Sequence, residues 1–374
     1  MNDFTPKEYA PEAIEPWPAA VRISDVLDDV IDQFYAYSHV SSFETTHVAV
    51  ALWTSATWFV DYCNHFPMSL ITAPEAECGK TTCLEIIGKM CKNPLQTANA
   101  SASSIFRIMH KRCTLLIDEA DVFLKKDSDL IGILNSGSGI NGSVLRCETD
   151  PKTKQIAVFE YPTFGAKALC GINSISLPET ITSRSIVIEL AKKPKDRRIS
   201  DFYEVANDRR KTADFDTIKR KLARLEIDFC EIFQDAKPPL PDWLQNRNRQ
   251  NWTPLLNLAY LASPEWFGAA LLACESLTNA GKSNSLSENL LGDIKKAFEV
   301  LMNEDDSILP SAELIAQLCN DEFAGWLTYN RGSQITARQI GQRLKPHGIH
   351  PLKTKSMRGY RRSQFSDVWA SYVD

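Results

Sequence analysis

The chain has 374 residues, of which 44% are hydrophobic and 24% charged, the balance of a protein that folds around more than one apolar core. Its formal net charge of -5 excludes a general polycation, so any nucleic-acid surface is expected to be a local patch. The ten cysteines follow no zinc or disulfide spacing, and the apolar runs are too short to span a membrane. We therefore predict a cytoplasmic protein with reduced thiols and no membrane partner.

The first half of the chain indicates an α/β architecture. Residues 1–64 begin with a loosely held arm rich in Pro and Ala, and apolar residues at helical spacing then predict helices at about 23–37 and 46–63. Residues 65–195 alternate short apolar runs with helical stretches, which predicts a parallel sheet covered on both faces. The expected strands lie near 68–73, 95–98, 113–117, 164–172 and 185–190.

The second half indicates two further parts. Residues 196–282 are expected to form a helical lid, and a stretch of Gly, Ser and Asn near its end marks a linker. Residues 283–374 are expected to form a basic, winged-helix-like domain, with helices at 311–319 and 337–344 followed by a hairpin.

A phosphate-binding loop is the first chemical signal. Gly79, Lys80 and Thr81 follow an apolar strand and open a helix, which suits a loop whose backbone N–H groups, lysine and hydroxyl hold phosphates. Pro74 stands where the usual pattern has its first glycine. The candidate nucleotide-binding residues are Glu77, Cys78, Gly79, Lys80, Thr81 and Thr82.

An acidic pair supplies the second signal. Asp118 and Glu119 end the buried run Thr114–Ile117, and Asp118 follows Lys80 by 38 residues. Carboxylates at a buried strand end are costly without a cation or partner. We therefore expect Thr81 and Asp118 to hold Mg²⁺, Glu119 to polarise the attacking water, and ATP and Mg²⁺ to be the cofactors.

Two further residues fit hydrolysis of ATP. Asn173 follows the predicted strand 164–172 and is a candidate sensor of the lytic water; the alternative is an ordinary strand-ending Asn. Arg184 precedes the strand 185–190 and is a candidate finger for the nucleotide of a neighbouring subunit; the alternative is a surface cation.

Residues 331–365 contain nine Lys or Arg and no Asp or Glu, which favours a nucleic-acid surface over the alternative of a solvated helical face. The candidate DNA-binding residues in this stretch are Arg338, Arg343, Lys353, Lys355, Arg358, Arg361 and Arg362.

The sequence resembles the domain-of-unknown-function 3631 family of phage and plasmid P-loop ATPases, which are AAA+ type and helicase-like. The resemblance is carried, in order along the chain, by the blocks Thr72–Thr82, Leu115–Asp121, Ile133–Gly137, Thr163–Lys167, Arg184–Ile186 and Asn251–Ala259. It implies an AAA+ αβα core over 65–195 and an origin on phages, plasmids or integrated elements.

Ring-shaped helicases of related build carry a hairpin between the acidic strand and the sensor strand, with a lysine directed into the pore. Residues 143–161 predict such a hairpin, and Lys152 and Lys154 are similar in placement; the alternative is a surface turn. The expected function is ATP-driven DNA translocation or unwinding by a ring, expected to be a hexamer, on single-stranded or forked DNA, with a replication or defence partner protein. The rival function is an ATP-dependent switch, loader or anti-phage ATPase that binds DNA without unwinding it.

Overall fold

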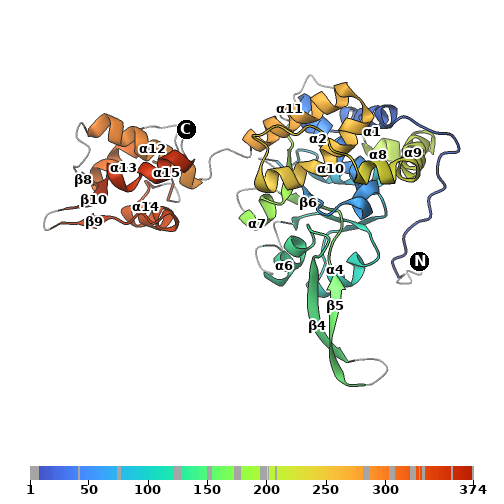
Figure 1. Cartoon of the computed structure of the whole chain (residues 1–374), viewed down its shortest axis with the longest axis horizontal. Helices are drawn as coiled ribbons and strands as arrows, with labels where there is room; N and C mark the ends of the chain where they lie inside the picture. The colour runs from blue at the N-terminus through green and yellow to red at the C-terminus, as the bar shows by residue number, and fades with distance from the viewer. Residues whose placement is uncertain are drawn as a thin grey trace. The chain divides into compact units, whose positions relative to one another are not determined.

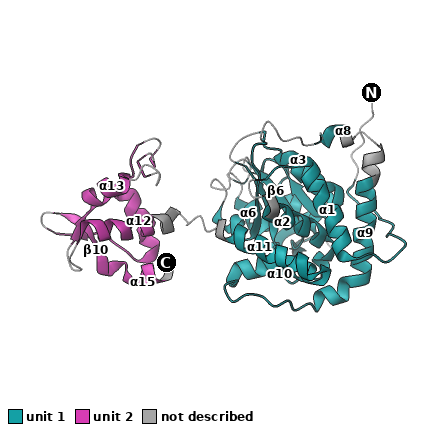
Figure 2. Cartoon of the chain, turned by 90° about the horizontal axis from the view of Figure 1, so that it is seen from above, with its two compact units in different colours: residues 1–279 teal, residues 280–374 magenta. Residues whose placement is uncertain are grey.

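The computed structural model of the chain divides into two compact units, Met1–Asn279 and Ala280–Asp374 (Figure 2). The first unit contains two hydrophobic clusters and the second contains one. The structure describes residues 8–40, 43–73, 77–120, 124, 128–149, 154–171, 178–193, 200, 202–206, 209–280, 286–302, 308–320, 326–327, 329–330, 333–354 and 357–372.

A parallel sheet of five strands forms the centre of the first unit (Figure 1). The strands are short, and β1, β3 and β6 are buried along their whole length. The order across the sheet is β2 (Pro94–Thr97), β3 (Thr114–Ile117), β6 (Lys167–Gly171), β1 (Met68–Thr72) and β7 (Ser185–Glu189). The predicted α/β class with a parallel central sheet is confirmed.

Successive strand residues face opposite sides of the sheet, as the two-residue period of a strand requires. In β3, Leu115 and Ile117 pack into one hydrophobic cluster, whereas Leu116 packs into the other. Burial on both faces explains why the strands are continuous apolar runs in the sequence.

Helices cover both faces of this sheet. One cluster is completed by α4 (Ala102–Met109), α6 (Ser128–Ser136) and α7 (Glu179–Thr182). The other is completed by α1 (Ile23–Tyr37), α2 (Phe43–Ala56), η1 (Thr57–Tyr62), α3 (Lys80–Met90), α8 (Phe202–Ala206), α9 (Arg209–Gln234), α10 (Asn246–Ala262) and α11 (Pro264–Ala280). The helices of the predicted lid therefore share a core with the N-terminal helices.

The N-terminal arm corrects one expectation. We predicted a loosely held arm, but its described residues make specific contacts with the first unit. The Tyr9 hydroxyl donates to the Asn93 carbonyl at 2.9 Å, and the Trp17 N–H donates to the Arg220 carbonyl at 2.8 Å. The Arg220 guanidinium also lies over the Trp17 ring, with its Cζ 5.4 Å from the ring centroid. Tyr and Trp anchors of this kind hold an extended segment without secondary structure of its own.

A two-stranded antiparallel hairpin, β4 (Ser143–Thr149) and β5 (Ile156–Pro162), projects from the first unit (Figure 1). One side of its base packs on α4, where the Phe106 and Tyr161 rings lie 4.7 Å apart. An ion pair between Arg107 and Glu148 fixes the same contact. The hairpin predicted from the sequence is therefore present.

The second unit combines helices with a small antiparallel sheet, in the order β8-β10-β9. The Thr336 side chain accepts from the Gln339 N–H and thereby caps α14. The elements are α12 (Leu286–Leu301), β8 (Ile308–Pro310), α13 (Ser311–Cys319), α14 (Ala337–Leu344), η3 (Lys345–His347), β9 (Leu352–Lys353), β10 (Arg358–Arg361), η4 (Arg362–Gln364) and α15 (Ser366–Tyr372). In the described part of the chain no helix is both long and apolar enough to cross a membrane.

Candidate nucleotide site

The loop after β1 leads directly into helix α3. Gly79 is the N-cap residue of α3 and has a φ of 79°, a left-handed conformation that glycine adopts without steric cost. Lys80, Thr81 and Thr82 form the first helical turn, whose N–H groups have no partner within the helix. Such a turn is suited to an anion. Pro74 lies outside the described residues, and Glu77, also at a positive φ of 61°, and the buried Cys78 precede the glycine.

The Asp118 carboxylate joins this loop to the end of β3. The Thr81 hydroxyl donates to Asp118 Oδ2 at 2.9 Å, and the Glu119 N–H donates to Asp118 Oδ1 at 2.9 Å. A third donor is the Cys170 thiol from β6, the strand between β1 and β3. Burial and the adjacent Asp118 carboxylate raise the pKa of Cys170, so the thiol keeps its proton. The sequence prediction that Thr81 and Asp118 meet therefore has direct geometric support.

Glu119 occupies an exposed position one residue beyond Asp118. Its φ of 53° lies in the left-handed region, where residues other than glycine are uncommon. Backbone strain of this kind is held in place only where the surroundings fix it, and it concentrates at functional sites. Here the N–H of Glu119 is tied to the side chain of Asp118.

Tyr203 is a site residue that the sequence analysis missed. It lies on α8, and its hydroxyl is hydrogen-bonded to Glu85 and Thr82 on α3. Burial, followed by the negative charge of Asp118, raises the pKa of Glu85. No motif in the sequence marks a tyrosine about 120 residues beyond the loop it touches; only the fold brings it there.

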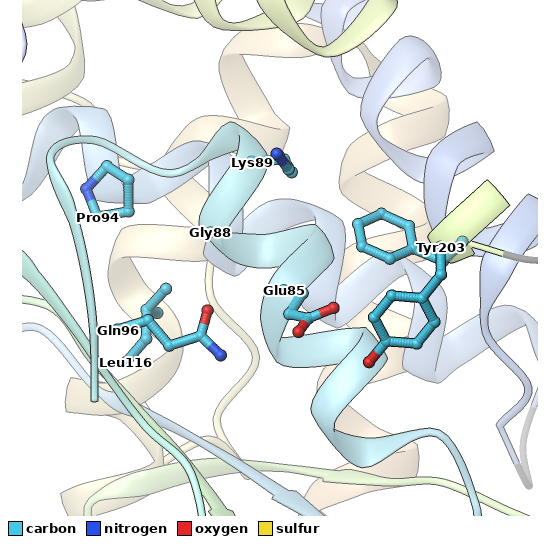
Figure 3. A pocket seen from close by; sticks show the side chains of 8 residues that line it. Glu85, Gly88, Lys89, Pro94, Gln96, Leu116 and Tyr203 are labelled. Atoms are coloured by element: carbon cyan, nitrogen blue, oxygen red, sulfur yellow. The ribbon is translucent and has the colours of Figure 1, made fainter. Parts of the chain in front are cut away.

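A cavity of about 470 Å³ lies beside the same helix, between α3, β2, β3 and α8 (Figure 3). Glu85 and Tyr203 stand at one end of it, and Pro94 lies at the other (Figure 3). The cavity flanks α3 along its length, whereas Thr81 and Asp118 are not among the residues that line it. It is therefore a separate feature from the candidate phosphate site.

Arg184 lies where the parallel strands begin, which we call the amino edge of the sheet. The loop that follows β1 lies where the strands end, the carboxyl edge. Met68, the first residue of β1, donates its N–H to the Arg184 carbonyl at 2.9 Å. The five residues of β1 span roughly 13 Å at about 3.3 Å per residue, so this edge is far from the loop after Thr72. The Arg184 side chain donates to the Thr180 carbonyl at 2.9 Å on its own side of the sheet. The fold does not bring Arg184 to the phosphate loop of the same copy, and Asn173 lies outside the described residues.

The donor set of the site suits magnesium bound with a nucleotide. Thr81 and Asp118 offer a hydroxyl and a carboxylate oxygen 2.9 Å apart, and Mg²⁺ prefers oxygen ligands. Within the described residues no three His, Cys, Asp or Glu side chains cluster as a metal cage. Magnesium at phosphate sites uses only one or two protein ligands, because the phosphates and water provide the rest.

The family model described as "Protein of unknown function (DUF3631)" matches residues 190–372, just under half of the chain. This match supports the resemblance to the DUF3631 family over that region, which does not include the phosphate loop. Of the blocks that carry the resemblance, Asn251–Ala259 lies inside the DUF3631 region, whereas the phosphate loop and the acidic pair precede it. None of the curated proteins matches the sequence.

The solved structures that are similar to the chain include the following two. One is "The A form apo structure of NrS-1 C terminal region-CTR(305-718)", at a TM-score of 0.41 and 11% identity, with 94% of this chain and 78% of that chain covered. The other is "SCCmec type IV Cch - active helicase", at a TM-score of 0.44 and 10% identity, with 96% of this chain and 73% of that chain covered. Both likenesses are partial in fold and low in sequence identity.

The second unit, which lies almost wholly in the DUF3631 region, presents part of the predicted basic surface. Arg338, Lys353 and Arg358 are exposed, and Arg343 is half-buried with its Nε donating to the Tyr329 hydroxyl at 3.2 Å. None of these four side chains forms a salt bridge to another described residue. Arg361 and Arg362 are half-buried, whereas Lys355 lies outside the described residues.

The candidate hairpin lysines are described only in part. Lys154 is exposed at the start of the return to β5, with a φ of 57°, and Lys152 lies outside the described residues. The structure therefore places one of the two cations at the far end of a projecting hairpin (Figure 1).

Proposed function

We propose that the chain is an ATP-hydrolysing DNA translocase or helicase of the AAA+ type. The observation that carries this proposal is the 2.9 Å hydrogen bond between the Thr81 hydroxyl and the Asp118 carboxylate. It joins the glycine-lysine-threonine loop to the acidic strand end, as a magnesium-nucleotide site requires. We propose in addition that it acts in the replication of a phage, plasmid or other mobile element, the role that the resemblance of its sequence blocks implies.

Each residue of the site has a distinct proposed role. Lys80 and the N–H groups of the first turn of α3 bind and orient the phosphates. Thr81 and Asp118 would hold Mg²⁺, which when bound neutralises the charge that develops on the phosphates. Glu119 accepts a proton from the attacking water, and the exposed position after β3 leaves room for that water.

The position of Arg184 supports a ring. A cation at the amino edge of the sheet serves a nucleotide only if another copy presents its carboxyl edge there. Repeating that head-to-tail contact closes a ring when the rotation permits, and we propose a hexamer. Arg184 would then neutralise the γ-phosphate in trans, an effect worth about a thousandfold or more in turnover in related chemistry. Asn173 would orient the lytic water.

Two basic regions would hold DNA. The cations of the second unit, in a winged-helix-like domain, bind the phosphate backbone, and the hairpin with Lys152 and Lys154 grips the strand in the pore. Binding by the second unit should depend steeply on salt, because each phosphate contact releases counterions. The hairpin, which is tied to α4 by Arg107 and Glu148, is the region expected to move DNA.

The test is a DNA-stimulated ATPase assay beside an unwinding assay on forked DNA, with Glu119→Gln as the inactive control. Stimulation with unwinding supports the helicase. Stimulation without unwinding selects the rival function, an ATP-dependent switch or loader. An absence of ATP hydrolysis in the presence of Mg²⁺ and DNA would refute both.

A further inference from the structure

Helix α10 holds the loop that carries Arg184. The buried Asn251 side chain donates through Nδ2 to the Ser183 carbonyl at 3.1 Å, and its Oδ1 lies 3.0 Å from His65 Nε2. Because the amide NH₂ is used on Ser183, the Asn251 oxygen accepts, so His65 carries its proton on Nε2. Asn251 thereby joins α10 to the residue before Arg184 and to the segment before β1.

A second arginine lies on the same face of α10. Arg247 precedes Asn251 by four residues, and positions four apart are neighbours on a helix surface. Since Asn251 contacts Ser183, Arg247 is directed to the side of the helix where Arg184 lies. Arg249 is two positions further along α10, which places it on a different face.

The charge of Arg247 acts on Arg184. Burial, and then the positive charge of Arg247, lower the pKa of Arg184. Burial and the charges of Arg247, Arg184 and Lys167 also lower the pKa of His65, so this imidazole adds no further charge. In the described ranges neither Arg184 nor Arg247 forms a salt bridge, and the first turn of α10 contains no acidic residue.

Two cations directed to the same side of α10, with no ion pair to a described carboxylate, repel each other, and a bound anion removes that cost. The Arg247 side chain donates to the Gln250 amide oxygen at 2.9 Å, a neutral acceptor that leaves its charge uncompensated. This pair is at the amino edge, so its anion cannot be the phosphate in the same copy's loop.

We propose that Arg247 is a second trans-acting cation: together with Arg184 it binds the terminal phosphate of the nucleoside triphosphate held by a neighbouring copy of the chain. The inference rests on the proposed function, which assigns only Arg184 to that contact. Asn251 is a positioning residue, because it fixes α10 against Ser183 and so sets the spacing of the two arginines. Lysine is a poor substitute for Arg247, since it lacks the planar pair of donors that suits phosphate oxygens.

The experiment compares Arg247→Ala, Arg247→Lys, Arg184→Ala and the matched control Arg249→Ala in the full-length assembled protein. We expect Arg247→Ala to lower ATPase turnover roughly tenfold to hundredfold, the size of a charged hydrogen bond, while the Kd for ATP stays unchanged. Arg247→Lys should recover only part of the loss, and Arg249→Ala should hydrolyse ATP at the wild-type rate.

Mixing two kinds of variant subunit shows whether Arg247 acts on the nucleotide of a neighbouring copy or on that of its own copy. Arg247→Ala subunits should regain activity when mixed with Lys80→Ala subunits, because some interfaces then pair an intact loop with an intact Arg247. Wild-type turnover of Arg247→Ala, with Arg184→Ala inactive, overturns this inference and spares the proposed function. Wild-type turnover of both variants overturns the shared site itself. A loss in Arg247→Ala that mixing with co-assembled Lys80→Ala never restores overturns the trans placement.

Discussion

At the carboxyl edge of the parallel sheet, the Thr81 hydroxyl and the Asp118 carboxylate meet beside the start of α3, whereas Lys167 and Arg184 lie at the amino edge. Thr81 and Asp118 form a hydrogen-bonded pair at the first edge. At the second edge Arg184 lies at the start of β7, and Lys167 is buried at the start of β6. The same five-residue strand, β1, runs from one edge to the other.

Under the proposed function, each copy of the chain would carry two unlike halves of a site. The carboxyl edge would bind and hydrolyse the nucleotide through Lys80, Thr81, Asp118 and Glu119. The amino edge would supply Arg184 and Arg247 to the nucleotide of a neighbouring copy. One strand connects the two edges: β1 ends at Thr72 before the phosphate loop and begins at Met68, whose N–H donates to the Arg184 carbonyl.

The largest effect is expected from removing the cation of the carboxyl edge. Lys80→Ala should weaken ATP binding by roughly a hundredfold or more, because the ammonium group is the main side-chain contact to the phosphates. Titration with a fluorescent ATP analogue measures the Kd. Lys89→Ala, an exposed lysine near the end of the same helix, is the matched control and should bind ATP normally.

The next effect separates binding from hydrolysis at the same edge. Glu119→Gln should keep ATP affinity and lower turnover by roughly a hundredfold to ten-thousandfold, the range for loss of a general base. The variant should also trap any ATP-dependent oligomer, which sedimentation in the presence of ATP and Mg²⁺ would detect. If Glu119→Gln hydrolyses ATP at the wild-type rate, Glu119 is not the catalytic carboxylate.

The hairpin test asks whether DNA movement depends on a region that is far from the nucleotide. Changing Lys152 and Lys154 together to Ala should leave much of the initial DNA binding, because under the proposed function the second unit would supply most phosphate contacts. Unwinding should fall while basal ATPase activity persists. Normal unwinding by the double variant would reduce the hairpin to a surface element.

The smallest effect concerns stability at the amino edge. Burial lowers the pKa of Lys167 to about 7, and its ammonium group donates to the carbonyls of Gly137 and Gly165 at 2.7 and 2.8 Å. In the unfolded chain a lysine titrates near 10.4, so between these values the unfolded state binds the extra proton. The free energy of unfolding should therefore rise with pH, by roughly 1–2 kcal/mol between pH 7 and pH 8.5.

Denaturant unfolding of the wild type and Lys167→Met across that interval checks this prediction. The informative quantity is the slope against pH, because the substitution also changes the absolute stability. Burial raises the pKa of Cys83 to about 12, and thiols of this kind oppose the trend above about pH 8.5, where unfolded cysteines ionise. An unchanged slope in Lys167→Met would show that Lys167 is protonated in the folded protein throughout.

Much of the fold could be predicted from local pattern. The spacing of apolar residues gave helix α1 at its observed bounds, and the runs near β1, β3 and β7 gave the strands to within a residue or two. These elements are local consequences of periodicity and strand composition. The prediction of a loosely held N-terminal arm was wrong because Tyr9 and Trp17 bind partners more than 80 residues away in the chain, which local composition does not encode.

The site was predictable only as far as motifs extend. Lys80, Thr81 and Asp118 are marked by spacing that chemistry requires, and the structure brings Thr81 and Asp118 together. Tyr203 and Arg247 carry no motif, since their relevance comes from helices that pack beside the sheet. Burial of Lys167 was equally hidden, because a lysine in a sequence usually indicates an exposed position.

The measurement that most directly tests the division of one site between two edges is the ATPase activity of mixed subunits. Arg184→Ala and Lys80→Ala should each be nearly inactive alone. When the two are mixed and shown to co-assemble, turnover should recover in part, because some interfaces pair an intact loop with an intact Arg184. Co-assembled mixtures that stay as inactive as the separate variants would contradict a site shared between neighbouring copies.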